Sequence, residues 1–308
     1  MDKNLASREV SDSDILRRTH ELVRFPEREI NNYKLTLIAP VRESDFPNCD
    51  WYGDYMSEEL GNIGFPVQLL LVDNTVDKNT EKKINEDVFS KLPSNVSPML
   101  MHQPKPGKIH CLNIALREAA APYIMMFDIN KRPDKGAMKA LFERINNDDS
   151  LDLVSAVLRV NESQPVQAWN AGALHIGRQW VWEYEMPEVL GDDIYTGILT
   201  EAVNGKVEVA GDIIVTDYKA LQLSPEELAM RLARWSAIIV QLQHLTIRHK
   251  EKLFHEFKIN GQWFNDFNSY LNALGLSEDT ETYVRELWLN ETFRFIDKLK
   301  MNPDMHVW

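Results

Sequence analysis

Short runs of almost continuously apolar residues alternate with amphipathic stretches between residues 33 and 218. Such runs are typical of strands buried on both faces of a sheet, as in parallel sheets whose strands are connected by helices. The pattern therefore predicts an α/β domain with a largely parallel sheet. The expected strands are Leu35–Ala39, Val67–Val72, Pro98–Met101 and Tyr123–Phe127, and the expected crossover helices are Tyr52–Ile63, Glu81–Leu92 and Ile109–Ala119.

After Leu151 the pattern is less regular. Apolar runs at Leu153–Val160 and Gly172–Ile176 indicate further strands, and helical spacing returns at Gln179–Glu185 and Ile194–Asn204. We expect these segments to complete the sheet with strands of mixed direction.

Both ends of the chain have a helical pattern. Ser13 or Asp14 can cap a charged helix that stops at Pro26. The segment Ser224–Glu227 combines an N-cap, a proline in the first turn and a carboxylate three residues after the cap, which together mark a strong helix start. We therefore expect a helical extension over residues 1–32, a central domain over 33–220 and a helical region over 221–308. The last of these could join two copies of the chain into a homo-oligomer.

Charge and cysteine content narrow the classes of function. The chain has 308 residues, with 34 Lys and Arg against 47 Asp and Glu, and its net charge of -13 argues against general nucleic-acid binding. Its two cysteines, Cys49 and Cys111, provide neither a disulfide framework nor a zinc-ligand spacing. No apolar run is long enough for a signal peptide or a membrane span. We expect a soluble, cytoplasmic protein.

Polar residues follow each of the four expected parallel strands. Ligands of such sheets bind beyond the carboxyl ends of the strands. Each segment taken alone is explained as a solvated turn, but their convergence on one edge favours a binding site. The segments are Pro40–Glu43, Asp73–Asn74, Pro106–Lys108 and Asp128–Arg132.

The order of these segments, over roughly residues 35–235, resembles the family 2 glycosyltransferases and their relatives with the GT-A fold. The resemblance implies a Rossmann-like mixed sheet that binds a nucleotide-sugar donor. In the family's second motif a pair of aspartates holds the nucleoside, and here Asn74 replaces the second of them. The residues that the resemblance assigns to the donor are Pro40, Glu43, Asp73, Asn74, Lys108, Asn113, Asp128 and Arg234.

A divalent cation, Mn or Mg, is also implied. Asp128-Ile129-Asn130 resembles the family's Asp-x-Asp metal motif, with Asn130 in place of the second carboxylate. Asp217 stands where the family's late strand often supplies another ligand, and it could restore the lost negative charge. The resemblance thus assigns the metal to Asp128, Asn130 and Asp217. Lys131 and Arg132 follow directly, either as surface cations or as groups that bind the diphosphate themselves.

The catalytic residues implied by the resemblance are Asp192 and Asp193, which match the family's Glu-Asp pair. In inverting members the second acid deprotonates the acceptor hydroxyl, so Asp193 is the candidate general base. The alternative is that the pair caps a helix beginning at Ile194. Arg231–Trp235 resembles the Gln-x-x-Arg-Trp motif of polysaccharide synthases, with Arg231 in place of Gln. Arg234 is either a diphosphate contact or an exposed helical arginine.

The resemblance implies a hexosyltransferase-type enzyme that uses a nucleotide sugar, with UDP favoured, and inverts the anomeric carbon. Its acceptor would be a small molecule, a glycan or a peptide. Two alternatives stay open. One is a retaining synthase with a small acceptor, similar to mannosylglycerate and glucosylglycerate synthases. The other is a diverged, non-catalytic GT-A domain that serves as a binding or scaffold protein.

Overall fold

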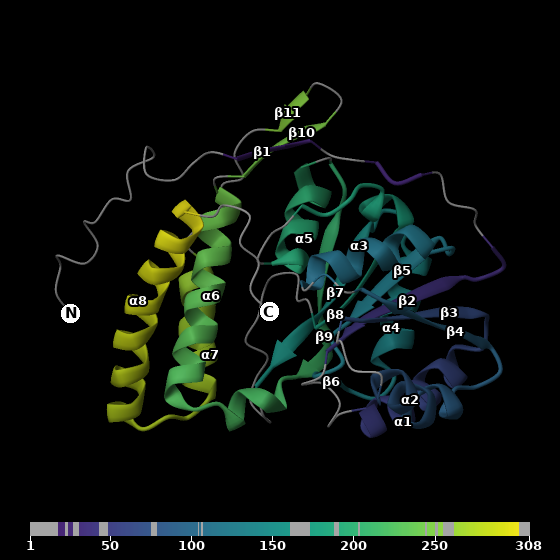
Figure 1. Cartoon of the computed structure of the whole chain (residues 1–308), viewed down its shortest axis with the longest axis horizontal. Helices are drawn as coiled ribbons and strands as arrows, with labels where there is room; N and C mark the ends of the chain where they lie inside the picture. The colour runs from purple at the N-terminus through teal and green to yellow at the C-terminus, as the bar shows by residue number, and fades with distance from the viewer. Residues whose placement is uncertain are drawn as a thin grey trace.

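An eight-stranded sheet forms the centre of the molecule (Figure 1). The computed structural model describes residues 18–21, 24–26, 31–42, 49–74, 79–103, 105, 107–160, 173–187, 191–202, 204–243, 245–249, 252–254 and 262–301. From one edge to the other the strands are β4 (Val96–His102), β3 (Val67–Asp73), β2 (Leu35–Val41), β5 (Tyr123–Phe127), β8 (Leu174–Arg178), β7 (Leu153–Arg159), β9 (Val207–Thr216) and β6 (Arg132–Pro133).

The prediction of a parallel first half and a mixed second half is confirmed. β2 pairs in parallel with both β3 and β5, and β3 pairs in parallel with β4. Every residue of β2 and β3 is buried, which explains their continuous apolar runs. β8 then runs antiparallel to β5 and β7, whereas β7 and β9 are parallel.

Helices cover both faces of the sheet. α1 (Cys49–Ile63) and α4 (Ala137–Asn147) pack on one face, and α3 (Lys108–Glu118) and α5 (Asp192–Ala202) pack on the other. Successive residues of β2 serve the two cores, with Leu37 on the α1 side and Ile38 on the α3 side. The sheet is therefore the middle of three layers.

Some helical segments differ from the sequence prediction. The stretch expected as one helix over Glu81–Leu92 divides into α2 (Asn79–Asp87) and the 3₁₀ turn η2 (Phe89–Lys91). The stretch expected as a helix at Gln179–Glu185 is the 3₁₀ turn η3 (Gln179–Trp182), where the indole of Trp182 is buried against the sheet. α4 was not among the predicted elements, although its apolar residues recur with helical spacing.

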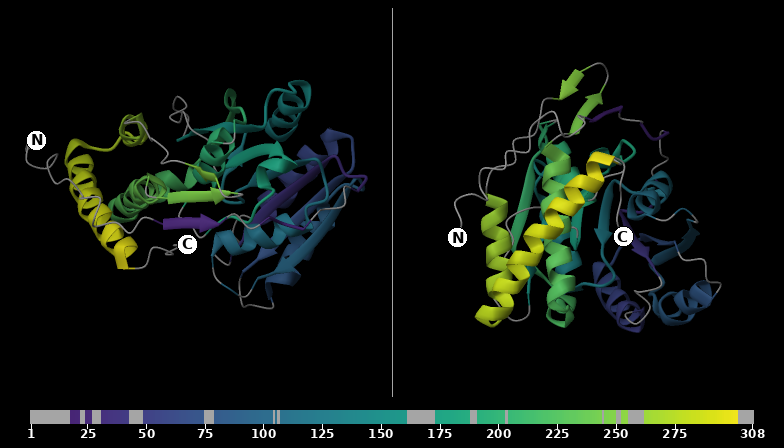
Figure 2. Two further views of the ribbon diagram at one scale, coloured as in Figure 1. Left: turned by 90° about the horizontal axis from the view of Figure 1, so that it is seen from above. Right: turned by 60° about the vertical axis from the view of Figure 1, so that its left-hand side comes forward.

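Three helices follow the sheet. These are α6 (Pro225–Gln243), α7 (Gln262–Ala273) and α8 (Glu278–Met301), and α8 packs obliquely against α6 (Figure 2, right). The predicted start of α6 is confirmed, because the Glu227 amide donates to Ser224 Oγ at 3.2 Å and the Ser224 amide donates to Glu227 Oε2 at 2.9 Å. Leu232 of α6 and Leu271 of α7 belong to the same hydrophobic core as β2, so the core continues across residue 220. A boundary between separate domains there stays a prediction.

A small sheet corrects the prediction of helical ends. β1 (Arg18–Glu21) pairs in parallel with β10 (Leu245–His249), which pairs antiparallel with β11 (Lys252–Phe254). The expected N-terminal helix is therefore wrong at β1, and residues 1–17 lie outside the described residues. The C-terminal region is likewise not wholly helical. Among the described residues, no helix is long and apolar enough to cross a bilayer.

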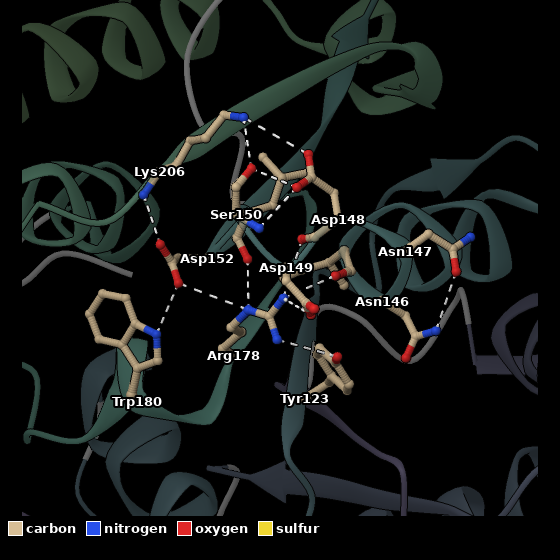
Figure 3. Close-up of polar contacts among 12 residues, drawn as sticks. Tyr123, Asn146, Asn147, Asp148, Asp149, Ser150, Asp152, Arg178, Trp180 and Lys206 are labelled. Atoms are coloured by element: carbon tan, nitrogen blue, oxygen red, sulfur yellow. Dashed lines mark hydrogen bonds and ion pairs between the residues drawn. The ribbon is translucent and has the colours of Figure 1, made fainter.

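The edge of the sheet where β5 begins has a purely structural set of polar contacts (Figure 3). The guanidinium of Arg178 donates to the backbone carbonyls of Leu151 at 2.8 Å and Asp148 at 3.2 Å, beyond the end of α4. Asp152 accepts from the Trp180 indole at 3.0 Å and from the Lys206 amide at 2.9 Å. The bond to Asp148 satisfies a carbonyl that the end of α4 leaves open. Together the contacts join the residues beside β7, β8 and β9 at the end of the sheet opposite the predicted site.

Candidate active site

The directions of the strands bring distant polar residues to one edge of the sheet. Asp128 follows the carboxyl end of β5, and two successive antiparallel pairings restore the direction of β5 in β7 and β9. Asp217 follows β9 and therefore lies at the same edge as Asp128. Its backbone amide donates to the carbonyl of Arg159, the last residue of β7, at 2.9 Å.

Lys108 joins three of the predicted segments. It is the first residue of α3, and its ammonium lies 3.0 Å from Asp128 Oδ1 and 3.1 Å from Asp192 Oδ2 at the start of α5. Burial lowers the pKa of Lys108, but the attraction of Asp128, Asp192 and Asp193 outweighs it and raises the pKa above its usual value. Lys108 therefore stays charged at neutral pH. Gly107, with φ of 129°, turns the chain into α3 in a conformation that favours glycine.

The predicted nucleoside-binding residues occupy neighbouring strand ends. Pro40 lies near the end of β2, and Asp73 is the last residue of β3. The Asp73 carboxylate is buried and lies 3.5 Å from Nδ1 of His102, the last residue of β4. Asn74 follows Asp73 and is partly buried. Glu43 lies outside the described residues.

Asn113 connects α3 to the segment before α5. Its Nδ2 donates to the Met186 carbonyl at 2.9 Å, and the Met186 amide donates to Asn113 Oδ1 at 2.8 Å. The nitrogen and the oxygen of the Asn113 side-chain amide thus both bond to backbone atoms. Asn113 positions the approach to Asp192 and Asp193, and its direct contact with a donor stays a prediction.

Asp217 is held by two cations from separate parts of the chain. Its Oδ2 lies 2.8 Å from Lys131 Nζ and 2.6 Å from Arg231 Nη1 on α6, and its side chain is fully buried. Arg231 also donates to the Tyr270 hydroxyl on α7 at 2.8 Å. Burial raises the pKa of Asp217, but Lys131 and Arg231 outweigh that effect and lower the pKa to about 2. Asp217 is therefore ionised at neutral pH.

This arrangement does not fit a divalent cation held by Asp128, Asn130 and Asp217. The charge of Asp217 is already opposed by two positive groups, and Asp128 is paired with Lys108. In the described part of the chain, no group of three His, Cys, Asp or Glu side chains could hold a metal ion. Two of the three predicted ligands each have a buried oxygen with no hydrogen-bond partner among the described residues, Asn130 Oδ1 and Asp217 Oδ1. A dication bound to these oxygens would lie beside the cations that already hold Asp217.

Arg234 is the other cation that α6 brings to this edge. Its pKa is lowered by burial first and then by the nearby Arg231 and Arg42, whereas Asp128 and Asp193 act in the opposite direction. Within the described residues its Nε is buried and makes no hydrogen bond. A contact of Arg234 with a diphosphate stays a prediction.

The sequence did not indicate several members of the site. Arg231 was noticed only as a departure from a family motif, and neither Tyr270 nor His102 was singled out. Arg132, considered beside Lys131, instead lies over aromatic rings, with its guanidinium carbon 5.5 Å from the ring centre of Trp51 and 4.9 Å from that of Tyr218. For His102, the signal that could have found it was its position beside Asp73 at the end of the next strand.

No protein-family model matches the chain, and no curated protein sequence matches it. Its fold is similar to that of mannosyltransferase PcManGT from Pyrobaculum calidifontis, solved in complex with GDP-Man and Mn2+. The TM-score is 0.51 with 16% identity, over 91% of this chain and 81% of that chain. S. aureus TarS 1–349 is also similar, with a TM-score of 0.46, 15% identity and coverage of 88% of this chain and 92% of that chain.

The likeness to the mannosyltransferase shows the fold. The chain has a GT-A-like glycosyltransferase fold, in agreement with the sequence prediction. At this level of identity the likeness does not place the chain in family 2.

Proposed function

We propose that the protein is a glycosyltransferase that moves a sugar from a nucleoside-diphosphate sugar to an acceptor hydroxyl. The observation that carries the proposal is the contact of one ammonium, that of Lys108, with both Asp128 and Asp192. These three residues come from separate segments, of which the sequence assigned Lys108 and Asp128 to the donor and Asp192 to the catalytic pair. The GT-A-like fold, shared with a mannosyltransferase solved with GDP-Man, supports the same function.

In this proposal Asp193 is the general base. The oxygen of the acceptor hydroxyl bonds to the anomeric carbon of the donor while Asp193 takes the hydroxyl proton. The bond from that carbon to the diphosphate oxygen breaks, and the nucleoside diphosphate leaves with the electron pair. Attack from the side opposite the leaving group inverts the carbon.

The neighbouring residues hold the base and stabilise the leaving group. The Asp192 carboxylate is paired with Lys108, which fixes the first turn of α5 and so orients Asp193. Lys108 is a fixed positive charge beside the developing charge of the diphosphate. Asp73, at the neighbouring strand end, is proposed to contact the nucleoside.

We favour a UDP-sugar as donor and a small molecule, glycan or peptide as acceptor. The mannosyltransferase structure contains Mn2+, so metal use is part of what has to be tested. Because the described residues around Asp217 do not fit a divalent cation, no step of the proposal depends on one.

The test is the thermal unfolding midpoint of the full chain with UDP, GDP, CDP or dTDP, each with and without Mn2+. A nucleotide at one hundred times its dissociation constant stabilises the native state by about 2.7 kcal/mol, which raises the midpoint by several degrees. One nucleotide should produce this shift. Asp73→Asn should reduce this shift of the unfolding midpoint. Asp212→Asn, at an exposed position within β9, should leave the shift unchanged. No shift with any of the four nucleotides contradicts the proposal.

A further inference from the structure

The carboxylate that the sequence assigned to a metal is bound instead by an ammonium. Lys131 Nζ lies 2.8 Å from Asp217 Oδ2, and the Lys131 side chain is only 13% exposed. The Lys131 backbone amide also donates to the Asp128 carbonyl at 3.0 Å, which closes a turn at the end of β5. This short turn therefore places the Lys131 ammonium beside the residues that were predicted to bind a metal.

Three arginines reach the same edge of the sheet. Arg42 follows β2, whereas Arg231 and Arg234 are three residues apart on α6 and so lie on neighbouring parts of its surface. Arg42 and Arg231 are both near enough to Arg234 to oppose its charge. Like charges gathered in a buried site are costly unless an anion compensates them.

Asp217 alone does not provide that compensation. It carries one negative charge against the two positive charges of Lys131 and Arg231, and Arg42 and Arg234 add two more nearby. Asp128 and Asp192 share the single ammonium of Lys108, and Asp193 is near enough to attract both Lys108 and Arg234. The five cations named here exceed the four carboxylates by one positive charge, which favours the binding of an anion among them.

We propose that fixed cations, Lys131 together with Arg42 and Arg234, bind the diphosphate of the donor, so that nucleotide binding and turnover need no divalent cation. Arg231 is a positioning residue, because it holds Asp217, which in turn holds Lys131. The inference rests on the proposed nucleotide-sugar function and adds to it how the leaving group is neutralised.

The side-chain chemistry suits this role. A lysine ammonium has three donors, of which Asp217 takes one in the described structure, and a guanidinium offers a planar fork that matches phosphate oxygens. Hydrogen bonds between such cations and phosphate are among the strongest in proteins. Fixed cations also stabilise the charge that develops on the departing diphosphate without having to be recruited from solution.

The experiment is calorimetric titration of the full chain with the nucleoside diphosphate that raises its unfolding midpoint, and with the matching monophosphate. Each titration is made in EDTA and again with Mn2+. The affinity of the wild-type chain for the diphosphate should agree within about twofold in the two buffers, since no bound metal contributes to it. Lys131→Met should weaken diphosphate binding about tenfold and monophosphate binding much less, and Mn2+ should not restore the loss.

Arg132→Met is the matched control, because it removes the neighbouring positive charge from a side chain that lies over Trp51 and Tyr218. Its diphosphate affinity should equal that of the wild type. Should Lys131→Met fail to fold, Arg234→Met serves in its place, and Lys131→Arg, which keeps the charge, should bind nearly as well as the wild type.

The outcomes separate the two proposals. Diphosphate binding that disappears in EDTA and returns with Mn2+ overturns the inference and leaves the proposed glycosyltransferase standing. Equal loss of diphosphate and monophosphate binding in Lys131→Met also overturns it, because the residue would then support the fold rather than the diphosphate. If none of the four nucleoside diphosphates binds in either buffer, the proposed function and the inference fail together.

Discussion

Replacement of Asp217 by asparagine isolates the free energy of one buried charge. Asparagine has nearly the shape of a protonated aspartic acid, so Asp217→Asn removes the charge and leaves the volume unchanged. The variant retains Lys131 and Arg231, which lie 2.8 and 2.6 Å from Asp217 Oδ2 in the wild type, and deprives both of their anion. We therefore expect it to fold with a lower free energy of unfolding.

The pKa of Asp217 sets the size of the effect. Burial raises the pKa of Asp217, but the attraction of Lys131 and Arg231 is stronger and lowers the pKa from 3.8 to about 2. Each pKa unit corresponds to 1.36 kcal/mol, so the ionised form contributes about 2 kcal/mol to the free energy of unfolding at pH 7. Loss of one partner of a buried ion pair costs about 3 to 5 kcal/mol in other proteins. The expected loss for Asp217→Asn at pH 7 is thus about 2 to 5 kcal/mol.

The pH dependence follows from the sign of the shift. Because the folded pKa is depressed, the stabilisation is complete well above 3.8 and is lost as the pH falls toward 2. Between pH 7 and pH 3 the wild type should lose about 1 kcal/mol that Asp217→Asn cannot lose, so the difference between them narrows by that amount.

The assay is urea unfolding of both proteins at pH 7 and at pH 3, with Asp212→Asn as the control. Asp212 lies on β9, the strand that precedes Asp217, but its side chain is 66% exposed, so its ion pair with Arg144 should contribute less than about 1 kcal/mol. A difference between wild type and Asp217→Asn that is as large at pH 3 as at pH 7 would refute the reasoning. Equal losses in the free energy of unfolding for Asp217→Asn and Asp212→Asn would refute it as well.

Three further substitutions test other parts of the site. Asp193→Asn should lower the rate of sugar transfer by about a hundredfold or more while nucleotide binding persists, and a rate close to that of the wild type would exclude the residue as general base. Asn113→Ala deletes the two hydrogen bonds to Met186 and should lower the free energy of unfolding by about 1 to 3 kcal/mol in urea, whereas an unchanged midpoint would show that the contact is dispensable. Gly191→Ala places a Cβ 2.7 Å from Ile238 Cγ2, so it should cost about 1 to 3 kcal/mol and slow transfer by displacing α5 from α6, and full activity in a kinetic assay would count against that coupling.

The local pattern of the sequence was enough to predict the parallel half of the sheet. β2, β3 and β5 were recognisable because strands buried on both faces need unbroken apolar runs, and α6 because the Ser224–Glu227 capping box depends only on nearby residues. The same local reasoning failed at β1. A short strand gains its stability from its partner, and β10 lies far along the chain.

The sequence also placed Lys108, Asp128 and Asp192 in one site, since motif order and the rule that ligands bind at carboxyl strand ends do not require side-chain positions. Only the tertiary structure determines which cations pair with the Asp217 carboxylate. Lys131 and Arg231 reach it from a turn after β5 and from α6, and neither spacing nor periodicity encodes a contact between segments so far apart. The position of these residues at one end of the sheet could thus be predicted, whereas their pairing depends on how helices and strands pack around a buried charge.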